Sequence, residues 1–292
     1  MNVLEVQGLT KRYPAFALEE VSFDLRPGAI TGFIGRNGAG KSTTFKSLLN
    51  LVHPDAGKVR FFGLDFAGHE GEIKSRVGYV PGEFVYYPRK KLGAIVDVTR
   101  HFYPNWDEAA YRRCLERFSL EEGKTVSQLS AGMKVKFALT LALSHRAELL
   151  LLDEPTSGLD PLMQREFFAI LRERNQAGTT VFLSSHVLSE IQRNCRRAAI
   201  IREGRMIACD SVEALSRTSA KRIVIHGAAD LSGLSGIRDR QDTEDGVSFL
   251  YSGDMAPLLT ALAAGHITDL SVAEPDLEEI FLHYYTEGGE AV

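Results

Sequence analysis

Cysteine and long apolar runs are both scarce in this 292-residue chain, and each scarcity excludes a class of protein. The 3 cysteines, Cys114, Cys195 and Cys209, lie far apart with no paired spacing. This arrangement argues against a disulfide framework or a zinc site and favours a reducing, cytoplasmic location. Because no run of about 18 apolar residues occurs, we do not expect the chain to span a membrane.

Basic clusters and a leader-like beginning are missing as well. The formal net charge is -4 and no long basic run occurs, so binding to nucleic acid is not expected. The first residues, Met-Asn-Val-Leu-Glu-Val, lack the basic-then-apolar layout of a signal peptide. What remains is the composition of a globular protein that is long enough to bury a substantial core.

One glycine-rich segment matches a phosphate-binding pattern. Residues 35–42 read Gly-Arg-Asn-Gly-Ala-Gly-Lys-Ser, which fits GxxxxGK[ST]. The apolar segment Ala29–Ile34 before it predicts a short buried strand. After it, apolar residues follow at the spacing of one helix face: Phe45, Leu48, Leu49 and Val52. The alternative, an ordinary glycine-rich turn, does not explain why a strand and a helix flank the segment.

Each part of this loop suits a phosphate chain. Gly35, Gly38 and Gly40 allow a tight bend and close approach of backbone N–H groups to phosphate oxygens. The helix start adds unpaired N–H groups and the positive end of a dipole. Lys41 is expected to reach the β- and γ-phosphates, and Ser42 to ligate Mg²⁺. The expected ATP contacts are Gly35, Arg36, Asn37, Gly38, Ala39, Gly40, Lys41, Ser42 and Thr43.

A second apolar strand ends in two acids. Leu149–Leu152 is followed by Asp153 and Glu154. A buried strand of a parallel sheet delivers its last residues to the edge where phosphates bind. We therefore expect Asp153 to hold Mg²⁺ through water and Glu154 to polarise the attacking water. Taken alone, the segment would also fit a plain strand followed by an acidic turn.

The hydrophobic patterns predict an α/β protein with two domains. Strands are expected at Val3–Val6, Val21–Leu25 and Val59–Phe62, then helices around residues 111–118 and 135–143. From Leu149 onward strands alternate with helices, at Leu149–Leu152, from Pro161, at Thr180–Ser184 and at Ala199–Ile201, which predicts a parallel sheet. The pattern breaks near residue 216. A small unit then follows, with strands at Ile223–Ile225 and Val247–Tyr251 and helices at Pro257–Ala264 and Asp276–Tyr285.

Four further sites make the chain similar to the ABC-type ATPases. Leu129-Ser-Ala-Gly-Met133 resembles their signature motif LSGGQ, and Ser157–Asp160 matches their D-loop. His186 corresponds to their switch histidine and Tyr13 to their adenine-stacking aromatic residue. All occur in the family order, and the resemblance covers about residues 1–215. Without it, His186 reads as a strand-end histidine and Tyr13 as a surface aromatic residue.

The resemblance implies a fold and a mechanism. The fold is a P-loop NTPase core with an antiparallel β subdomain and a helical subdomain at about residues 85–145, spanning residues 1–216. A small α+β extension spans residues 217–292. Two such domains, identical or sister subunits, pair head to tail around ATP and Mg²⁺. Ser130 and Gly132 then face the partner's ATP, Asp160 is expected to contact ATP, and His186 joins Lys41 and Glu154 in catalysis.

Three residues depart from the family pattern. Gly82 stands where the family has a glutamine that ligates the metal, with Glu83 next to it. Either Glu83 substitutes as a ligand or the metal keeps an extra water. Ala131 and Met133 replace a glycine and the glutamine of the signature, while Ser130 and Gly132 are retained.

Function follows from the set of motifs. The leading hypothesis is the ATP-hydrolysing subunit of an ABC transporter of the export type, peripheral on the inner face of the membrane and docked on separate permease subunits. The alternative is an ABC-type ATPase without a membrane partner, acting in translation or on nucleic acid. A small-molecule kinase would leave the signature and His186 unexplained. The aromatic segment His101–Asp107 is either part of a docking surface or a local core containing Phe102 and Trp106.

Overall fold

The chain forms two compact units, Met1–Asp210 and Ser211–Val292. The structure is a computed structural model that describes residues 1–83, 87–216, 221–243 and 245–273. The domain boundary expected after residue 216 falls at the end of helix α8 (Val212–Ser216), just inside the second unit. The two units are described separately.

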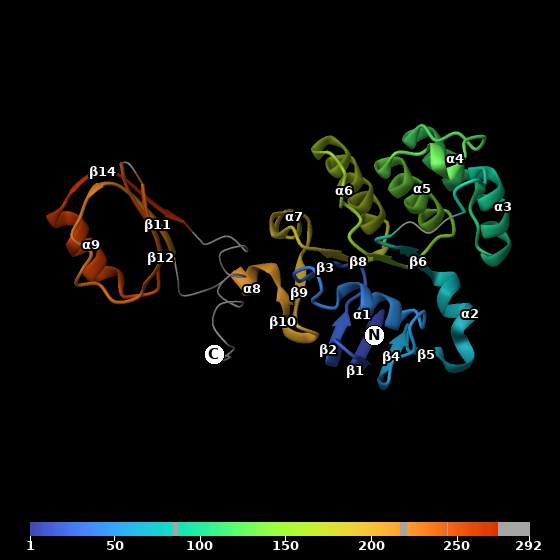
Figure 1. The fold of residues 1–292 in the computed structure, drawn as a ribbon, viewed down its shortest axis with the longest axis horizontal. Coiled ribbons are helices and arrows are strands. Elements are labelled where there is room, and N and C mark those ends of the chain that lie inside the picture. The colour runs from blue at the N-terminus through green and yellow to red at the C-terminus, as the bar shows by residue number, and fades with distance from the viewer. Residues whose placement is uncertain (84–86, 217–220, 244, 274–292) are drawn as a thin grey trace. The chain divides into compact units, whose positions relative to one another are not determined.

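Two sheets form the framework of the first unit (Figure 1). The first has the order β2-β1-β4-β5, built from β1 (Leu4–Tyr13), β2 (Phe16–Leu25), β4 (Ala56–Phe61) and β5 (Leu64–Asp65). The second has the order β10-β9-β3-β8-β7-β6, built from β3 (Ile30–Ile34), β6 (Val77–Val80), β7 (Leu149–Leu152), β8 (Thr180–Ser185), β9 (Arg197–Arg202) and β10 (Arg205–Ser211). Strands β9, β3, β8, β7 and β6 run parallel, as the alternating pattern predicts.

Helix α1 (Lys41–Leu48) shares one apolar core with both sheets. Phe45 stacks on Phe182 of β8 at 5.1 Å between ring centroids, and Phe33 of β3 lies 5.2 Å from the same ring. The expectation that Val52 belongs to this helix is wrong. The helix ends at Leu48, and Asn50 adopts a left-handed backbone with φ 56°, which turns the chain away before Val52.

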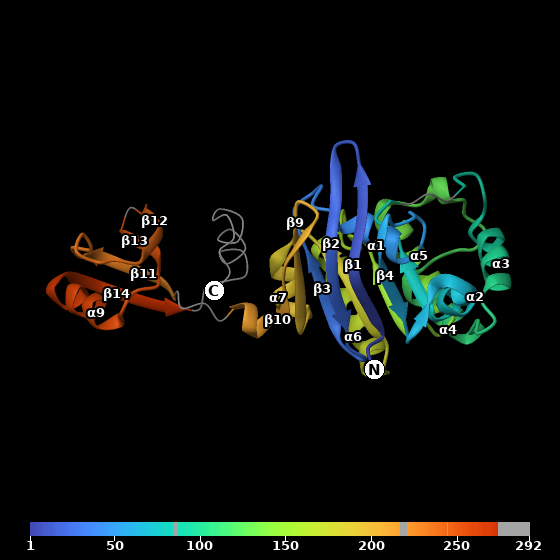
Figure 2. The ribbon, with the colours of Figure 1, turned by 90° about the horizontal axis from the view of Figure 1, so that it is seen from below.

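Most of the other helices lie on the opposite side of the six-stranded sheet from β1, β2 and β4 (Figures 1 and 2). The predicted helical insert contains α3 (Leu92–Phe102), α4 (Glu108–Phe118) and α5 (Ala131–Leu143). Helices α2 (Phe66–Arg76), α6 (Pro161–Gln176) and α7 (Leu188–Asn194) complete the unit. Asp107, Ser130 and Asp160 cap α4, α5 and α6, each accepting a hydrogen bond from a backbone N–H of the first turn.

In the described part of the second unit, helix α9 packs on a four-stranded antiparallel sheet. Its strand order is β12-β13-β11-β14, from β11 (Lys221–Ala228), β12 (Ile237–Thr243), β13 (Gly246–Tyr251) and β14 (His266–Ala273), with α9 (Met255–Ala264). Alternate residues such as Ile223, Ile225 and Phe249 meet Leu258 of α9 in a small core. The expected helix Asp276–Tyr285 lies outside the described residues.

Candidate active site

The phosphate loop occupies the turn between β3 and α1. Gly38 and Gly40 have φ values of 82° and 111°, a region that residues with a side chain rarely adopt. The space beside Gly38 is open, whereas a Cβ on Gly35 would lie 2.7 Å from the carbonyl oxygen of Ile201. Arg36, Asn37 and Gly38 are exposed at the loop tip. The loop therefore offers free backbone on its outer side and is locked to the sheet on its inner side.

Lys41, Glu154 and His186 form one continuous cluster. Lys41 is buried; its Nζ donates to the carbonyl oxygens of Gly35 at 2.6 Å and Arg36 at 3.2 Å. The same Nζ lies 3.0 Å from Oε1 of Glu154, and Oε2 of Glu154 lies 2.6 Å from Nδ1 of His186. Because a carboxylate oxygen accepts, Nδ1 of His186 is the donor in this contact.

Glu154 adopts an unusual backbone conformation. Its φ of 48° lies in the left-handed region, where a non-glycine residue is uncommon. The backbone N–H of Glu154 donates to Oγ of Ser184 at 2.7 Å, and that hydroxyl donates to Oδ1 of Asp153 at 2.8 Å. Ser184 thus fixes both acids at the end of β7, and the strained turn aims Glu154 at Lys41.

Asp153 and Ser42 supply the oxygen atoms that a magnesium ion prefers. Asp153 is buried, and Ser42 is exposed at the start of α1. A Cβ on Gly82 would lie 3.4 Å from Oδ2 of Asp153, so this glycine borders the carboxylate without offering a ligand. Glu83 is exposed beside it. Among the described residues no group of three or more acidic, histidine or cysteine side chains surrounds a single point.

The signature residues and the D-loop lie against each other. A Cβ on Gly132 would lie 3.3 Å from Cδ2 of Leu159, next to Asp160. Ser130 and Asp160 are both exposed, and each side chain accepts a hydrogen bond from its own helix, from the N–H groups of Met133 and Met163. Both residues therefore lie at exposed helix starts, where their side chains make local hydrogen bonds.

Tyr13 lies at the end of the β1–β2 hairpin and is 42% exposed. It pairs with Phe16 across the hairpin, and a Cβ on Gly40 would lie 2.9 Å from Cζ of Phe16. The hairpin end therefore packs directly against the phosphate loop, which places an exposed aromatic ring beside it.

The aromatic segment 101–107 is partly exposed and partly buried. Phe102 is 74% exposed, so the interpretation that it fills a local core is wrong: it lies at the last turn of α3 and points outward. Trp106 is half-buried, with its ring 5.4 Å from that of Tyr111, and it packs locally. Tyr103 stacks at 3.9 Å on His145, a buried residue that sequence reasoning missed.

Ser184, Thr156 and Glu190 also escaped sequence reasoning. Ser184 could have been found from register, because Leu152 pairs with Leu183 and the next residues, Asp153 and Ser184, must then be neighbours. Thr156 and Glu190 meet through a buried hydrogen bond of 2.8 Å between segments far apart in the sequence. No local pattern signals such a contact.

The fold and the site together define a P-loop nucleotide-hydrolysing domain: a phosphate loop between a parallel strand and a helix, with two acids at the end of the neighbouring strand. The matching family model, described as ABC transporter, covers residues 18–157. The bacitracin transport ATP-binding protein BcrA of Bacillus licheniformis is 30% identical over 298 residues, covering 96% of each chain. The linearmycin resistance ATP-binding protein LnrL of Bacillus subtilis is 28% identical over 303 residues, covering 96% of this chain and 97% of LnrL.

A solved structure of an ATP-binding subunit of an ABC transporter matches with a TM-score of 0.68 at 30% identity, covering 74% of this chain and 92% of that one. The chain belongs to the ATP-binding proteins of the ABC transporter family. It is an ATPase that binds ATP and serves transport, as the leading hypothesis states. The relatives support this assignment and not a role in translation or on nucleic acid.

Proposed function

We propose that this chain powers export through separate membrane subunits by closing and reopening a head-to-tail dimer around ATP. The observation on which this rests is the Lys41–Glu154–His186 cluster at the mouth of the phosphate loop. Export is favoured because the relatives BcrA and LnrL are named for bacitracin transport and linearmycin resistance. Neither substrate is assigned to this chain.

Within one subunit the residues divide the work. The loop N–H groups and Lys41 bind the phosphates, and Tyr13 stacks on the adenine base. Glu154 polarises the water that attacks the γ-phosphate, and His186 holds Glu154 through Nδ1. Ser42 and Asp153 would hold Mg²⁺, which would neutralise charge on the phosphates. Gly82 borders Asp153 and brings no side-chain ligand, so a water would fill that coordination position.

The second subunit completes the site. Ser130 and the start of α5 present a hydroxyl and a helix N-terminus, both suited to a γ-phosphate, on the exposed surface. Asp160 caps α6 beside them. Because these groups lie outward and cap their own helices, we assign them to the ATP held by the partner's phosphate loop.

The membrane subunit is proposed to dock on the groove between α2, α3 and α5. This groove has a volume of about 490 Å³ and includes Phe102 and Val98, which are 74% and 61% exposed. None of the helices in the described part of the chain is long and apolar enough to cross a membrane. Exposed aromatic and aliphatic side chains favour such an interface.

The test is to tag the chain in its native cell, separate membranes from the soluble fraction, and identify what copurifies. A polytopic membrane protein in the membrane fraction supports the proposal. Changing Phe102 to Asp should release the chain from that protein, whereas Leu51→Asp, at an exposed apolar residue outside this groove, serves as the control. A chain that copurifies only with ribosomes or nucleic acid would contradict the transport assignment.

A further inference from the structure

A buried carboxylate lies behind the catalytic cluster and has no part in the chemistry described above. Glu190 belongs to α7, four residues after His186, and is only 8% exposed. A buried carboxylate is costly unless hydrogen bonds replace its hydration, so its partners indicate why the position holds an acid.

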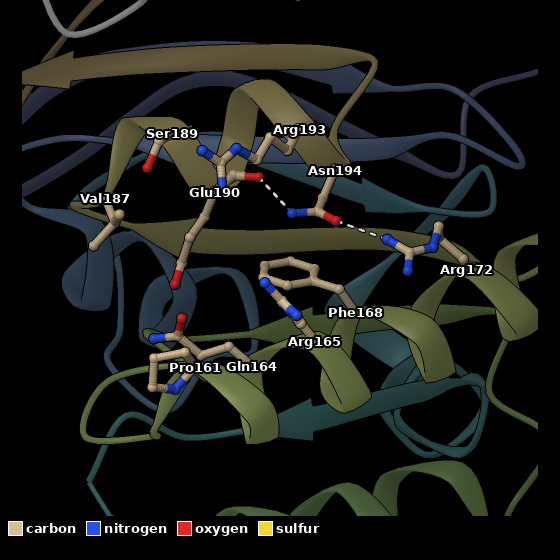
Figure 3. A pocket seen from close by; sticks show the side chains of 10 residues that line it. All are labelled: Pro161, Gln164, Arg165, Phe168, Arg172, Val187, Ser189, Glu190, Arg193 and Asn194. Carbon is tan, nitrogen blue, oxygen red and sulfur yellow. Dashed lines mark hydrogen bonds between the residues drawn. The ribbon is translucent and has the colours of Figure 1, made fainter.

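Two hydroxyl groups donate to the same oxygen of Glu190. Oγ1 of Thr156 lies 2.8 Å from Oε2 of Glu190, and Oγ of Ser185 lies 3.1 Å from it. Figure 3 shows the Glu190 side chain running from α7 toward the start of α6, where Pro161 and Gln164 lie. One carboxylate oxygen therefore joins the turn after β7 to the end of β8, two segments that lie far apart in the sequence.

These two segments carry Glu154 and His186. Thr156 follows Glu154 by two residues, and its carbonyl oxygen accepts the N–H of Leu159 in the turn that leads to Asp160. Ser185 ends β8 directly before His186, and its hydroxyl oxygen also accepts the N–H of Val187 at 3.0 Å. Moving either hydroxyl would shift one member of the 2.6 Å contact between Glu154 and His186 relative to the other.

We propose that Glu190 is a positioning residue for ATP hydrolysis. It fixes the loop from Glu154 to Asp160 against the strand end that presents His186, and it touches neither nucleotide nor water itself. The inference rests on the proposed roles of Glu154 and His186. A displacement of about 1 Å at a reacting group can cost on the order of 100-fold in rate, so loss of this tie is expected to lower kcat.

The test compares variants that remove the acceptor with variants that keep it. Glu190→Ala should lower kcat for ATP hydrolysis about 10- to 100-fold and leave KM for ATP and the affinity for a fluorescent ATP analogue within about twofold. Glu190→Gln keeps one acceptor oxygen for both hydroxyls and should restore most of kcat. Arg193→Ala, an exposed change on the same helix and beside the same pocket of about 450 Å³, is the matched control.

A second pair of variants tests the same hydrogen bond from its donor, Thr156. Thr156→Val removes the donor and should lower kcat as Glu190→Ala does, whereas Thr156→Ser keeps the hydroxyl and should not. The double variant Thr156→Val with Glu190→Ala should lose little more than either single one. This pair decides the matter if Glu190→Ala fails to fold.

Three results would overturn the proposal: unchanged kcat in the folded Glu190→Ala and Thr156→Val variants, equal losses of kcat and ATP affinity, or no rescue by Glu190→Gln and Thr156→Ser. Failure of the underlying roles is separable, because Glu154→Gln in an otherwise unchanged chain tests them alone. If that variant kept its turnover, the assignment of Glu154 would fall regardless of the behaviour of Glu190.

Discussion

The two surfaces expected to touch ATP are built in opposite ways. At the phosphate loop, Lys41 is buried and paired with Glu154, which in turn contacts His186. At the signature surface, Ser130 and Asp160 are exposed, and their side chains cap the helices on which they stand. The first surface has its charges arranged within one chain, and the second presents helix starts outward.

This difference teaches how the work divides between subunits. In the proposed mechanism a single chain contains the groups that bind the phosphates and polarise water. The side chains of Ser130 and Asp160 each cap their own helix, and in the proposed mechanism they act on hydrolysis only when a second subunit is paired with the first. Variants at the first surface should therefore act on one subunit, and variants at the second should act only on the pair.

Glu154→Gln should break the first surface most severely. The amide cannot accept a proton, so we expect turnover to fall by about 100- to 10,000-fold with ATP binding retained. The bound dimer should then accumulate with ATP, which light scattering after gel filtration can measure. Asp24→Asn, an acid in β2 away from this cluster, provides the control. Substantial residual hydrolysis in Glu154→Gln would contradict its assignment.

Lys41→Ala should weaken the binding of ATP as well as lower its turnover. Charged hydrogen bonds contribute about 1.5–3 kcal/mol each, so loss of the Lys41 ammonium is expected to weaken ATP binding by roughly 10- to 100-fold. Titration calorimetry with Mg-ATP measures the change. Lys46→Ala, exposed on the same helix, should bind as the unmodified chain does. Unchanged affinity in Lys41→Ala would contradict the phosphate-loop assignment.

Ser130 tests the second surface with a matched pair. Asp and Asn both cap helices, but only Asp places a negative charge where a γ-phosphate would approach. Ser130→Asp should leave ATP affinity of the single subunit unchanged and lower turnover about tenfold or more, while Ser130→Asn loses less. Loss of the ATP-dependent dimer, measured in the Glu154→Gln background, should accompany Ser130→Asp only. Equal behaviour of the two variants would argue against a phosphate at this surface.

Much of this comparison could be predicted from the sequence, because the first surface is encoded locally. The loop 35–42, the acids after β7 and the caps at Ser130 and Asp160 each follow from short patterns. Long-range contacts could not be predicted in this way. The tie from Glu190 to Thr156, and the short edge strand β5, depend on tertiary neighbours that no local spacing encodes.

His145 tests how the signature helix is anchored, with the smallest expected effect. This buried ring at the end of α5 has Nδ1 3.1 Å from the carbonyl oxygen of Leu141 and Nε2 3.2 Å from that of Val77 in β6. Burial lowers the pKa of His145 below its ordinary value, although both carbonyl oxygens act in the opposite direction. The folded state therefore favours the neutral ring, and the stability it contributes is present above the ordinary pKa of about 6.5 and is lost as the pH falls through the lower, folded pKa.

His145→Phe should keep the stack on Tyr103 while removing the titrating group. At pH 7.5 the variant should melt at a lower temperature, because phenylalanine cannot donate the hydrogen bond of about 1 kcal/mol that the imidazole makes to a backbone carbonyl oxygen. As the pH is lowered below 6.5, the difference in melting temperature between the two chains should narrow. Only the unmodified chain must then keep a buried imidazole neutral at a pH that favours its protonation. His53→Phe, an exposed substitution, serves as the control. If the difference in melting temperature stayed constant or widened on acidification, the neutral imidazole would not be what holds the signature helix to β6.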